Sequence, residues 1–140
     1  MSERVAVAKP LPRITPELEP FFAAARNHEL VVQRCRSCGQ LRFPAREVCP
    51  KCWSTEREWT PVSGRGEVFS FYWMHQKYHP AFADELPYAV VVVQLEEGPR
   101  MATNVLGCSH DELRIGMPVE VTFEERSPEI TLPQFRPAAR

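Results

Sequence analysis

Four cysteines arranged as two CxxC pairs are the feature that most constrains how this chain can fold. Cys35 and Cys38 form the first pair, Cys49 and Cys52 form the second, and ten residues separate the pairs. A two-residue spacing lets a tight turn present both sulfurs to one ion, and four thiolates suit a closed, tetrahedral Zn²⁺ site. Gly39 follows the first pair, where a left-handed backbone is commonly needed to leave such a turn. The spacing therefore predicts a structural zinc ribbon.

The chemistry of four thiolates also limits what the metal can do. A rubredoxin-like iron site takes the same ligands and stays open as an alternative. A catalytic zinc is disfavoured, because four cysteines leave no coordination position for water or substrate. Zinc would instead supply folding free energy, of order 10 kcal/mol in structural zinc peptides. Cys108 stands apart from the pairs and is expected to be a small buried apolar residue rather than a nucleophile.

Composition places the chain among soluble globular proteins. It has 140 residues, of which 44% are hydrophobic and 25% charged, which suits one ordinary domain or two very small ones. We see no signal-peptide core near the N-terminus, and the longest apolar run, residues 89–93, is too short to cross a bilayer. We therefore expect a cytoplasmic protein with reduced thiols and no membrane partner.

Residues 1–62 are expected to contain a lead, a helix and the ribbon. Residues 1–14 show no periodicity and are predicted to be a flexible lead. Residues 15–29 are predicted to form an N-terminal helix, with Thr15 as its cap and Pro16 at its first position. The apolar side chains at helical spacing are Leu18, Phe21, Phe22 and Ala25. The sequence leaves open whether the two phenylalanines pack on this chain's own core or on a partner subunit.

Residues 30–62 are assigned to the zinc ribbon, and residues 63–140 read as a β domain. Five candidate strands in the β domain are rich in β-branched and aromatic residues and are bounded by Gly, Pro or acidic turns. They cover residues 66–74, 88–95, 100–107, 118–126 and 130–137. The connection after the third strand is long enough for a short helical turn capped by Ser109. Five short strands with this insertion predict a small closed barrel of the OB type, since a sandwich usually needs about seven. The expected fold class is thus mainly β.

The stretch FSFYWMHQKYHPAF, residues 69–82, is unusually aromatic. Because side chains alternate along a strand, both faces should carry large groups. One face is predicted to hold Phe69, Phe71 and Trp73, and the other Val68, Tyr72 and Met74. An aromatic face left outside the core is an exposed patch unless the helix, the ribbon, a ligand or a partner covers it. The candidate contact residues are Phe71, Trp73, Tyr78, His79 and Phe82.

Charge is distributed unevenly along the chain. Residues 31–52 contain five basic residues and one acid, whereas the β domain has more acids than bases. Guanidinium groups suit phosphate recognition because they donate in a planar fork. The candidate phosphate or partner contacts are Arg34, Arg36, Arg42, Arg46, Arg65 and Arg100. No HExxH, GxSxG, Walker or GxGxxG pattern occurs, so no catalytic residue is predicted and the chain is expected to bind, position or assemble.

The order of these parts resembles a known family. The blocks that carry the resemblance are LVVQRCRSCGQLRFPAREVCPKC, SGRGEVFSF, YHPAF, LPYAVVVVQLEEGPRMATNVLG and GMPVEVTFEE, and together they span roughly residues 20–137. The chain is similar to proteins that join a rubredoxin-like zinc ribbon to an OB-fold, are associated with acyl-CoA metabolism, and long carried a "domain of unknown function" label.

The resemblance implies an accessory subunit of a thiolase-superfamily enzyme, such as a thiolase, an acyltransferase or a lipid-transfer-protein-type aldolase. The partner would carry the nucleophile and base, while this subunit completes a heterotetramer and helps to bind or channel a CoA thioester. The acyl group and the direction of the reaction stay open.

Two other functions remain as alternatives at this point. Zinc ribbons and OB-folds also bind single-stranded nucleic acid, and aromatic strands can stack bases. Against nucleic acid stand the acidic balance of the β domain and the absence of Lys and Arg from residues 88–95. The other alternative is an acyl-CoA sensor that acts without an enzyme partner.

Overall fold

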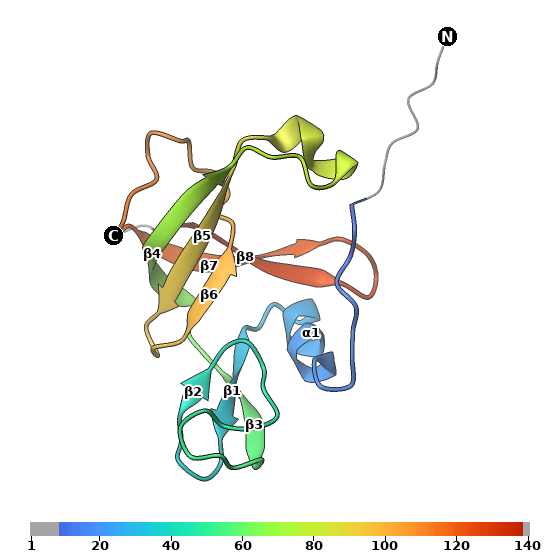
Figure 1. Ribbon diagram of the computed structural model, residues 1–140, viewed down its shortest axis with the longest axis vertical. Coiled ribbons are helices and arrows are strands. Elements are labelled where there is room, and N and C mark those ends of the chain that lie inside the picture. Colours follow the sequence, from blue (N-terminus) through green and yellow to red (C-terminus); the bar gives the residue numbers. More distant parts are fainter. Residues whose placement is uncertain (1–8, 139–140) are drawn as a thin grey trace.

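The computed structural model describes residues 9–138, and it is mostly β with one short helix, as the sequence predicts. The part of the predicted lead that falls on residues 1–8 lies outside the described residues, and residues 9–14 contain no helix or strand. Helix α1 (Glu19–Arg26) precedes a three-stranded sheet, which is followed by a five-stranded sheet (Figure 1). Within residues 9–138, no helix has the length and apolar character needed to cross a membrane.

Helix α1 packs on the chain's own core. A hydrogen-bonded turn opens at Thr15, whose carbonyl accepts from the backbone N–H of Glu19 at 2.9 Å, and the α-helix itself begins at Glu19. Phe21 and Phe22 are both buried. The Phe21 ring lies 5.7 Å from that of Phe43 and 6.0 Å from that of Trp59. The two phenylalanines therefore join the helix to the ribbon, which settles the question that the sequence leaves open.

The ribbon is built around its first strand. Strand β1 (Val31–Cys35) pairs antiparallel with both β2 (Leu41–Arg42) and β3 (Arg57–Pro61). Gln33 stands opposite Arg42 on one side and Trp59 on the other. Because β1 is central, four of its five residues are buried and its end delivers Cys35 to the metal site.

The second sheet is the predicted OB-type barrel. Its strands are β4 (Arg65–Met74), β5 (Tyr88–Leu95), β6 (Arg100–Thr103), β7 (Pro118–Glu125) and β8 (Thr131–Pro137). They are ordered β6-β5-β4-β7-β8, and a short 3-10 helix, η1 (Pro80–Glu85), connects β4 to β5. The two edges meet at a parallel bridge between Val105 and Phe135, where the Leu106 N–H donates to the Phe135 carbonyl at 2.7 Å. This bridge closes the sheet on itself.

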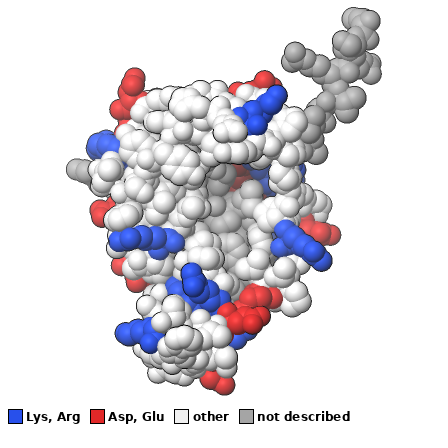
Figure 2. Space-filling view, in the orientation of Figure 1, with Lys and Arg blue, Asp and Glu red and all other residues white. Residues whose placement is uncertain are grey.

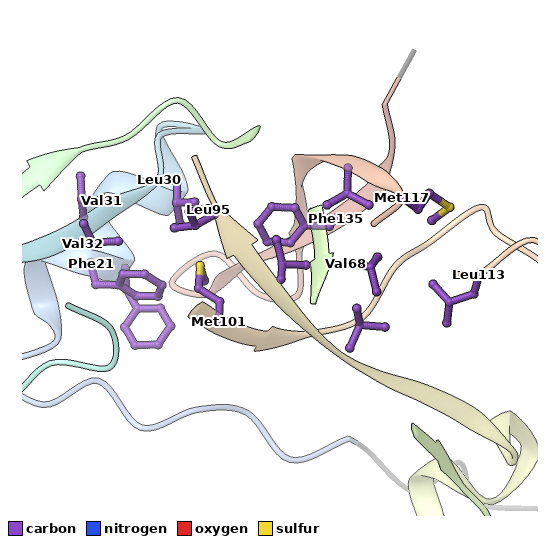
Figure 3. Close-up of a cluster of buried hydrophobic side chains, with 14 of the residues drawn as sticks. Phe21, Leu30, Val31, Val32, Val68, Leu95, Met101, Leu113, Met117 and Phe135 are labelled. Atoms are coloured by element: carbon purple, nitrogen blue, oxygen red, sulfur yellow. The ribbon is translucent and has the colours of Figure 1, made fainter. Parts of the chain in front are cut away.

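One hydrophobic core runs through both sheets. Figure 3 shows Phe21, Val31 and Val32 at one end of the cluster, Leu95 and Met101 in its middle, and Phe135, Val68, Met117 and Leu113 beyond them. Phe135 is fully buried at the centre of the barrel. Because the same cluster contains ribbon and barrel side chains, loss of one part exposes apolar surface of the other.

The alternation predicted for residues 68–74 is wrong at its beginning. A β-bulge shifts the register so that Val68 stands opposite Val93 while Phe71 stands opposite Val91. Val68 is consequently buried on the same side as Phe71, and Phe69 is the extra residue, 42% exposed. A bulge places two residues opposite one and resets the alternation, which a count along the sequence cannot reveal. The correction moves Phe69 to the outer side, which also carries the exposed Tyr72.

Candidate functional site

The four paired cysteines sit in two equivalent turns. The Gly39 N–H donates to the Cys35 carbonyl at 2.9 Å, and the Trp53 N–H donates to the Cys49 carbonyl at 2.9 Å. Gly39 has φ 78° and Trp53 has φ 66°, so both turns end in a left-handed residue. Each turn brings the two sulfurs of one CxxC pair to the same side, where the other pair faces them.

The arrangement of sulfurs fits one tetrahedral zinc ion. The Sγ atoms of the four cysteines all lie within 4.8 Å of one another. Cys35 and Cys52 Sγ are 3.5 Å apart, and Cys38 and Cys49 Sγ are 3.7 Å apart. Zinc–sulfur bonds of ~2.3 Å in tetrahedral geometry give sulfur–sulfur distances of roughly 3.8 Å. Because all four positions are filled by protein, zinc there would hold the fold and would not bind substrate.

The electrostatics of the site favour a cation. The Cys38 N–H points at the Cys35 sulfur at 3.4 Å and, with the Ser37 N–H, lowers the pKa of the Cys35 thiol to about 6. At Cys52 the Ser54 N–H acts in the same direction, but burial and the neighbouring sulfurs outweigh it and raise the pKa to about 11. Cys52 keeps its proton because desolvation of its sulfur and hydrogen bonds with the neighbouring sulfurs disfavour the thiolate. A divalent cation would replace that proton and hold all four cysteines as thiolates.

Arg42 is a structural residue of the ribbon. It is only 7% exposed, and its Nε donates to the Oε1 atom of the fully buried Gln33 at 2.8 Å. Its Nη2 donates to the Arg46 carbonyl at 3.1 Å, and the Arg46 N–H also donates to Gln33 Oε1 at 2.8 Å. The guanidinium of Arg42 thus lies inside the ribbon, whereas the side chain of Arg46 is exposed.

The other predicted basic contacts are divided between ribbon and barrel. Arg34 pairs with Glu58 at 2.9 Å, and Arg36 approaches the same carboxylate at 3.8 Å. On the barrel, Arg65 pairs with Glu96 at 3.4 Å, and the Arg100 guanidinium lies 3.7 Å from the centre of the Phe69 ring. On the face in Figure 2, Lys and Arg side chains are separated by uncharged surface and by acids. Among residues 9–138, the predicted basic contacts do not come together in one phosphate-binding site.

The structure brings two of the predicted aromatic contacts to one cavity. Trp73 is half-buried with its ring 4.0 Å from that of His110, and Phe82 lies 6.3 Å from Tyr88, centre to centre. Phe71 is partly buried against the core with its ring 6.2 Å from that of Trp73, and Tyr78 is 74% exposed. His79 caps η1 by accepting the Ala81 N–H at its Nδ1 atom, 3.1 Å away.

The cavity lies at one end of the barrel and has a volume of about 590 Å³. Its walls come from residues 9–11, η1, the start of β5, the segment after β6 and the β7–β8 pair. Figure 2 shows this face hollowed, in the region that lies between the barrel and the N-terminal segment in Figure 1. Sequence reasoning found Trp73 and Phe82 but missed members such as Asn104, Cys108 and Gln134, because they come from distant segments. We call this space the barrel-end cavity.

Cys108 lines the barrel-end cavity and remains a protonated thiol at neutral pH. Burial raises its pKa above the ordinary value of 9.0, and the charge of Glu112 acts in the same direction. A thiol of raised pKa is a poor nucleophile. Cys108 was expected to be a buried apolar residue, and the structure places it at the cavity wall, where it is only partly buried.

Trp53 is a residue that sequence reasoning missed. It is 80% exposed and adopts a left-handed backbone that is unfavourable for a bulky side chain. The signal was present in the sequence, because Gly follows the first CxxC pair and Trp follows the second at the equivalent position. An exposed aromatic side chain on a strained backbone is a candidate contact for another molecule.

Comparison with family models divides the chain into two adjacent blocks. Residues 22–58 match the rubredoxin-like zinc ribbon domain of ChsH2. Residues 59–124 match the C-terminal OB-fold domain of ChsH2. The boundary between the blocks falls within β3.

Two curated relatives and one solved structure are similar over most of the chain. A probable enoyl-CoA hydratase alpha subunit of Thermomonospora curvata is 43% identical over 130 residues, which are 93% of this chain but 40% of that protein. The benzoylsuccinyl-CoA thiolase subunit BbsA of Thauera aromatica is 35% identical over 112 residues, 76% of each protein. The structure described as "Ltp2-ChsH2(DUF35) aldolase" contains a chain that is 43% identical, with a TM-score of 0.81, over 92% of this chain and 100% of that one.

Proposed function

The chain belongs to the ChsH2 family, whose members carry a rubredoxin-like zinc ribbon and an OB-fold domain, and from this membership we propose that it is a non-catalytic accessory subunit that binds a thiolase-superfamily enzyme and helps to hold or channel an acyl-CoA thioester. The observation that carries the proposal is the match over 92% of this chain to a whole chain of the Ltp2-ChsH2(DUF35) aldolase. The partner enzyme supplies the nucleophile and base for cleavage or formation of a C–C bond, as in a thiolase or retro-aldol reaction.

The metal site supports this division of labour. Four cysteine ligands leave zinc no position for a substrate, so the ion contributes stability and orientation rather than chemistry. The ribbon shares a core with helix α1 and the barrel, so the ion also fixes how the ribbon surface sits relative to the barrel. A rigid, pre-oriented surface suits a subunit whose task is to complete another protein's site.

The outer side of the barrel offers a surface for the partner. Phe69 is 42% and Tyr72 54% exposed, and Arg100 stacks over the Phe69 ring. We call these three residues the outer aromatic strip. Aromatic and Arg side chains are the types that dominate binding energy at protein interfaces. The strip therefore supports docking of the enzyme subunit along β4 and β6.

The exposed arginines of the ribbon support contact with the phosphates of CoA. Arg36 is 60% exposed, and its contact with Glu58 is long, at 3.8 Å. The side chain of Arg46 is exposed to solvent. Neither guanidinium is buried, so both are available for bidentate contact with phosphate. Arg42, by contrast, supports Arg46 from inside.

Co-expression with a thiolase-superfamily enzyme from the same source organism tests the central proposal. We expect the two proteins to co-elute as a heterotetramer with two copies of each, measured by light scattering, and CoA-thioester cleavage to require both. Phe69→Ser with Tyr72→Ser should weaken the complex at least tenfold. Ile115→Ser, which also changes a 69% exposed apolar residue, is the matched control and should leave the complex intact. Separate elution, or full activity of the enzyme alone, would overturn the proposal.

A second experiment tests the phosphate contact within the complex. Arg36→Glu with Arg46→Glu should raise KM for the acyl-CoA while leaving kcat nearly unchanged, because the contact is remote from the reacting bond. Arg136→Glu changes a 58% exposed arginine on β8 and serves as the control. An unchanged KM in the double variant removes the arginines from the proposal and leaves the assembly claim standing.

A further inference from the structure

The barrel-end cavity contains a polar side chain that the described part of the chain leaves unpaired. Gln134 on β8 is 9% exposed and lines the cavity. Its Oε1 atom is buried and has no hydrogen-bond partner among residues 9–138. A buried amide without a partner is costly, and native proteins rarely retain one. The cavity is the open space beside it, so its partner is expected to be a molecule that enters there.

The walls of the cavity are suited to an apolar body. Trp73, Phe82 and Tyr88 present aromatic rings, and His110 lies against Trp73 with ring centres 4.0 Å apart. A volume of about 590 Å³ lies within the range of small-molecule sites, which are mostly apolar with a few placed polar groups. Gln134 supplies an unpaired amide beside these rings, and the lining also includes the charged side chains of Lys9, Glu85, Glu124 and Arg126.

Charged groups around the cavity are already neutralised within the chain. Lys9 Nζ lies 2.7 Å from Glu85 Oε2, and Arg126 Nη2 lies 3.2 Å from Glu124 Oε1. Each of these two cations therefore has its own carboxylate, and among residues 9–138 the cavity lining offers no unpaired Lys or Arg for a phosphate. The cavity consequently favours an uncharged molecule over the nucleotide end of a cofactor.

We infer that the barrel-end cavity binds the uncharged acyl portion of a thioester, with the Gln134 amide hydrogen-bonded to a hydroxyl or carbonyl group on that acyl chain. The chemistry of the occupant, an apolar body with one hydrogen-bonding group, follows from the cavity itself. Its identity as the acyl end of a CoA thioester rests on the proposed function. A free uncharged molecule shares this chemistry, and the probes below separate the two sources.

The test uses the full zinc-loaded chain and four probes: CoA, hexanoyl-CoA, 3-hydroxyhexanoyl-CoA and the uncharged N-acetylcysteamine thioester of 3-hydroxyhexanoate. Calorimetric titration should show binding of the three acylated probes and none of CoA. The 3-hydroxy thioester should bind about tenfold more tightly than the unsubstituted one. Because Cys108 lines the cavity and the four other cysteines hold zinc, bound ligand should also slow alkylation of Cys108 by iodoacetamide.

Gln134→Met keeps the shape of the side chain and removes its amide. This variant should lose the tenfold preference for the 3-hydroxy thioester and should unfold at a higher temperature than the parent without ligand. Gln94→Met, on β5 outside the cavity, is the matched control and should change neither property. If the variant is more stable but keeps the preference, Gln134 does not contact the ligand and the inference is overturned.

The outcomes separate this inference from the proposed function. If the complex with the enzyme forms but no acylated probe binds or protects Cys108, the cavity assignment falls and the accessory role stands. If the N-acetylcysteamine thioester binds and the acyl-CoA thioesters do not, the occupant is a free uncharged molecule and the acyl-CoA assignment is wrong. If the probes bind but no complex forms, the proposed function is the part that fails.

Discussion

Glu17 and Arg57 form a two-point ion pair that ties the turn before α1 to the zinc ribbon. Arg57 Nε donates to Glu17 Oε1 at 2.8 Å, and Arg57 Nη2 donates to Glu17 Oε2 at 2.9 Å. Glu17 Oε1 also accepts from Gln33 Nε2 at 2.7 Å, and Gln33 in turn holds Arg42. A continuous set of hydrogen bonds thus connects the entry of the helix with the interior of the ribbon.

This ion pair predicts a pH-dependent contribution to stability. The hydrogen bonds from Arg57 are the largest influence on the Glu17 carboxyl and hold its pKa below the ordinary value of 4.5. A lowered folded pKa means that the stabilisation is complete above the unfolded value and is lost as pH falls through the folded value. Glu17→Gln should therefore destabilise the chain by about 1 kcal/mol at pH 7, and the difference from the parent should vanish as the pH falls below 4.5.

Urea unfolding of both proteins at equal zinc content, from pH 7 downward, measures this difference. Glu19→Gln is the control, because its pair with Arg26 is more exposed, and it should cost less than about 0.5 kcal/mol. A Glu17→Gln difference that stays constant with pH would show that the ion pair does not carry the effect.

Removal of zinc should unfold more than the ribbon. The ribbon contributes Val31 and Val32 to the cluster that continues through Leu95 into the barrel, so its collapse exposes apolar barrel surface. A chelator, or Cys35→Ser, should abolish the stoichiometric zinc measured by mass spectrometry and lower the melting temperature of the whole chain. Cys108→Ser should retain one zinc per chain. If the melting temperature of the barrel did not change on chelation, the two sheets would be energetically independent.

Local features of the sequence predicted the metal site and most strands. The cysteine spacing specifies the ribbon because each CxxC turn depends on adjacent residues only. The run of β-branched residues in β5 likewise marks a strand by its own composition. The order of five strands and the insertion after the third were sufficient for an OB-type barrel. The structure adds the parallel bridge at Phe135 that closes it.

Features that depend on contacts between distant segments could not be predicted from the sequence. Arg42 looked like a surface cation in sequence, but β2 places it beside Gln33, whose amide replaces water as its partner. Phe69 was grouped with Phe71 and Trp73 on one face because a bulge leaves no mark in the alternation of residue types. The barrel-end cavity draws on segments from Lys9 to Gln134, so no local window contains it.

Gly66 is predicted to be irreplaceable at the junction of three strands. It stands opposite Leu95 of β5 and Val119 of β7, and a Cβ atom there would meet the Gln94 carbonyl oxygen and, at 2.9 Å, Val93 Cγ1. Backbone cannot yield as a flexible side chain can, so Gly66→Ala should destabilise the chain by about 2 kcal/mol or more. Denaturant unfolding measures this loss against Ser70→Ala in the same strand, which should cost well under that amount. Equal stability of the two variants would contradict the predicted clash.

Trp53→Gly is expected to gain stability and lose binding. Glycine adopts the left-handed backbone of this position without steric cost, as Gly39 does in the first turn, so the zinc-loaded variant should gain about 1 kcal/mol. The same change removes an 80% exposed aromatic side chain, and the complex with the enzyme should weaken about tenfold if Trp53 is an anchor at the interface. Val48→Gly removes a nearby exposed apolar residue without relieving strain and should show no gain in stability. Melting temperature and titration of the enzyme measure the two effects separately, and a variant that gains stability with undiminished binding would exclude Trp53 from the interface.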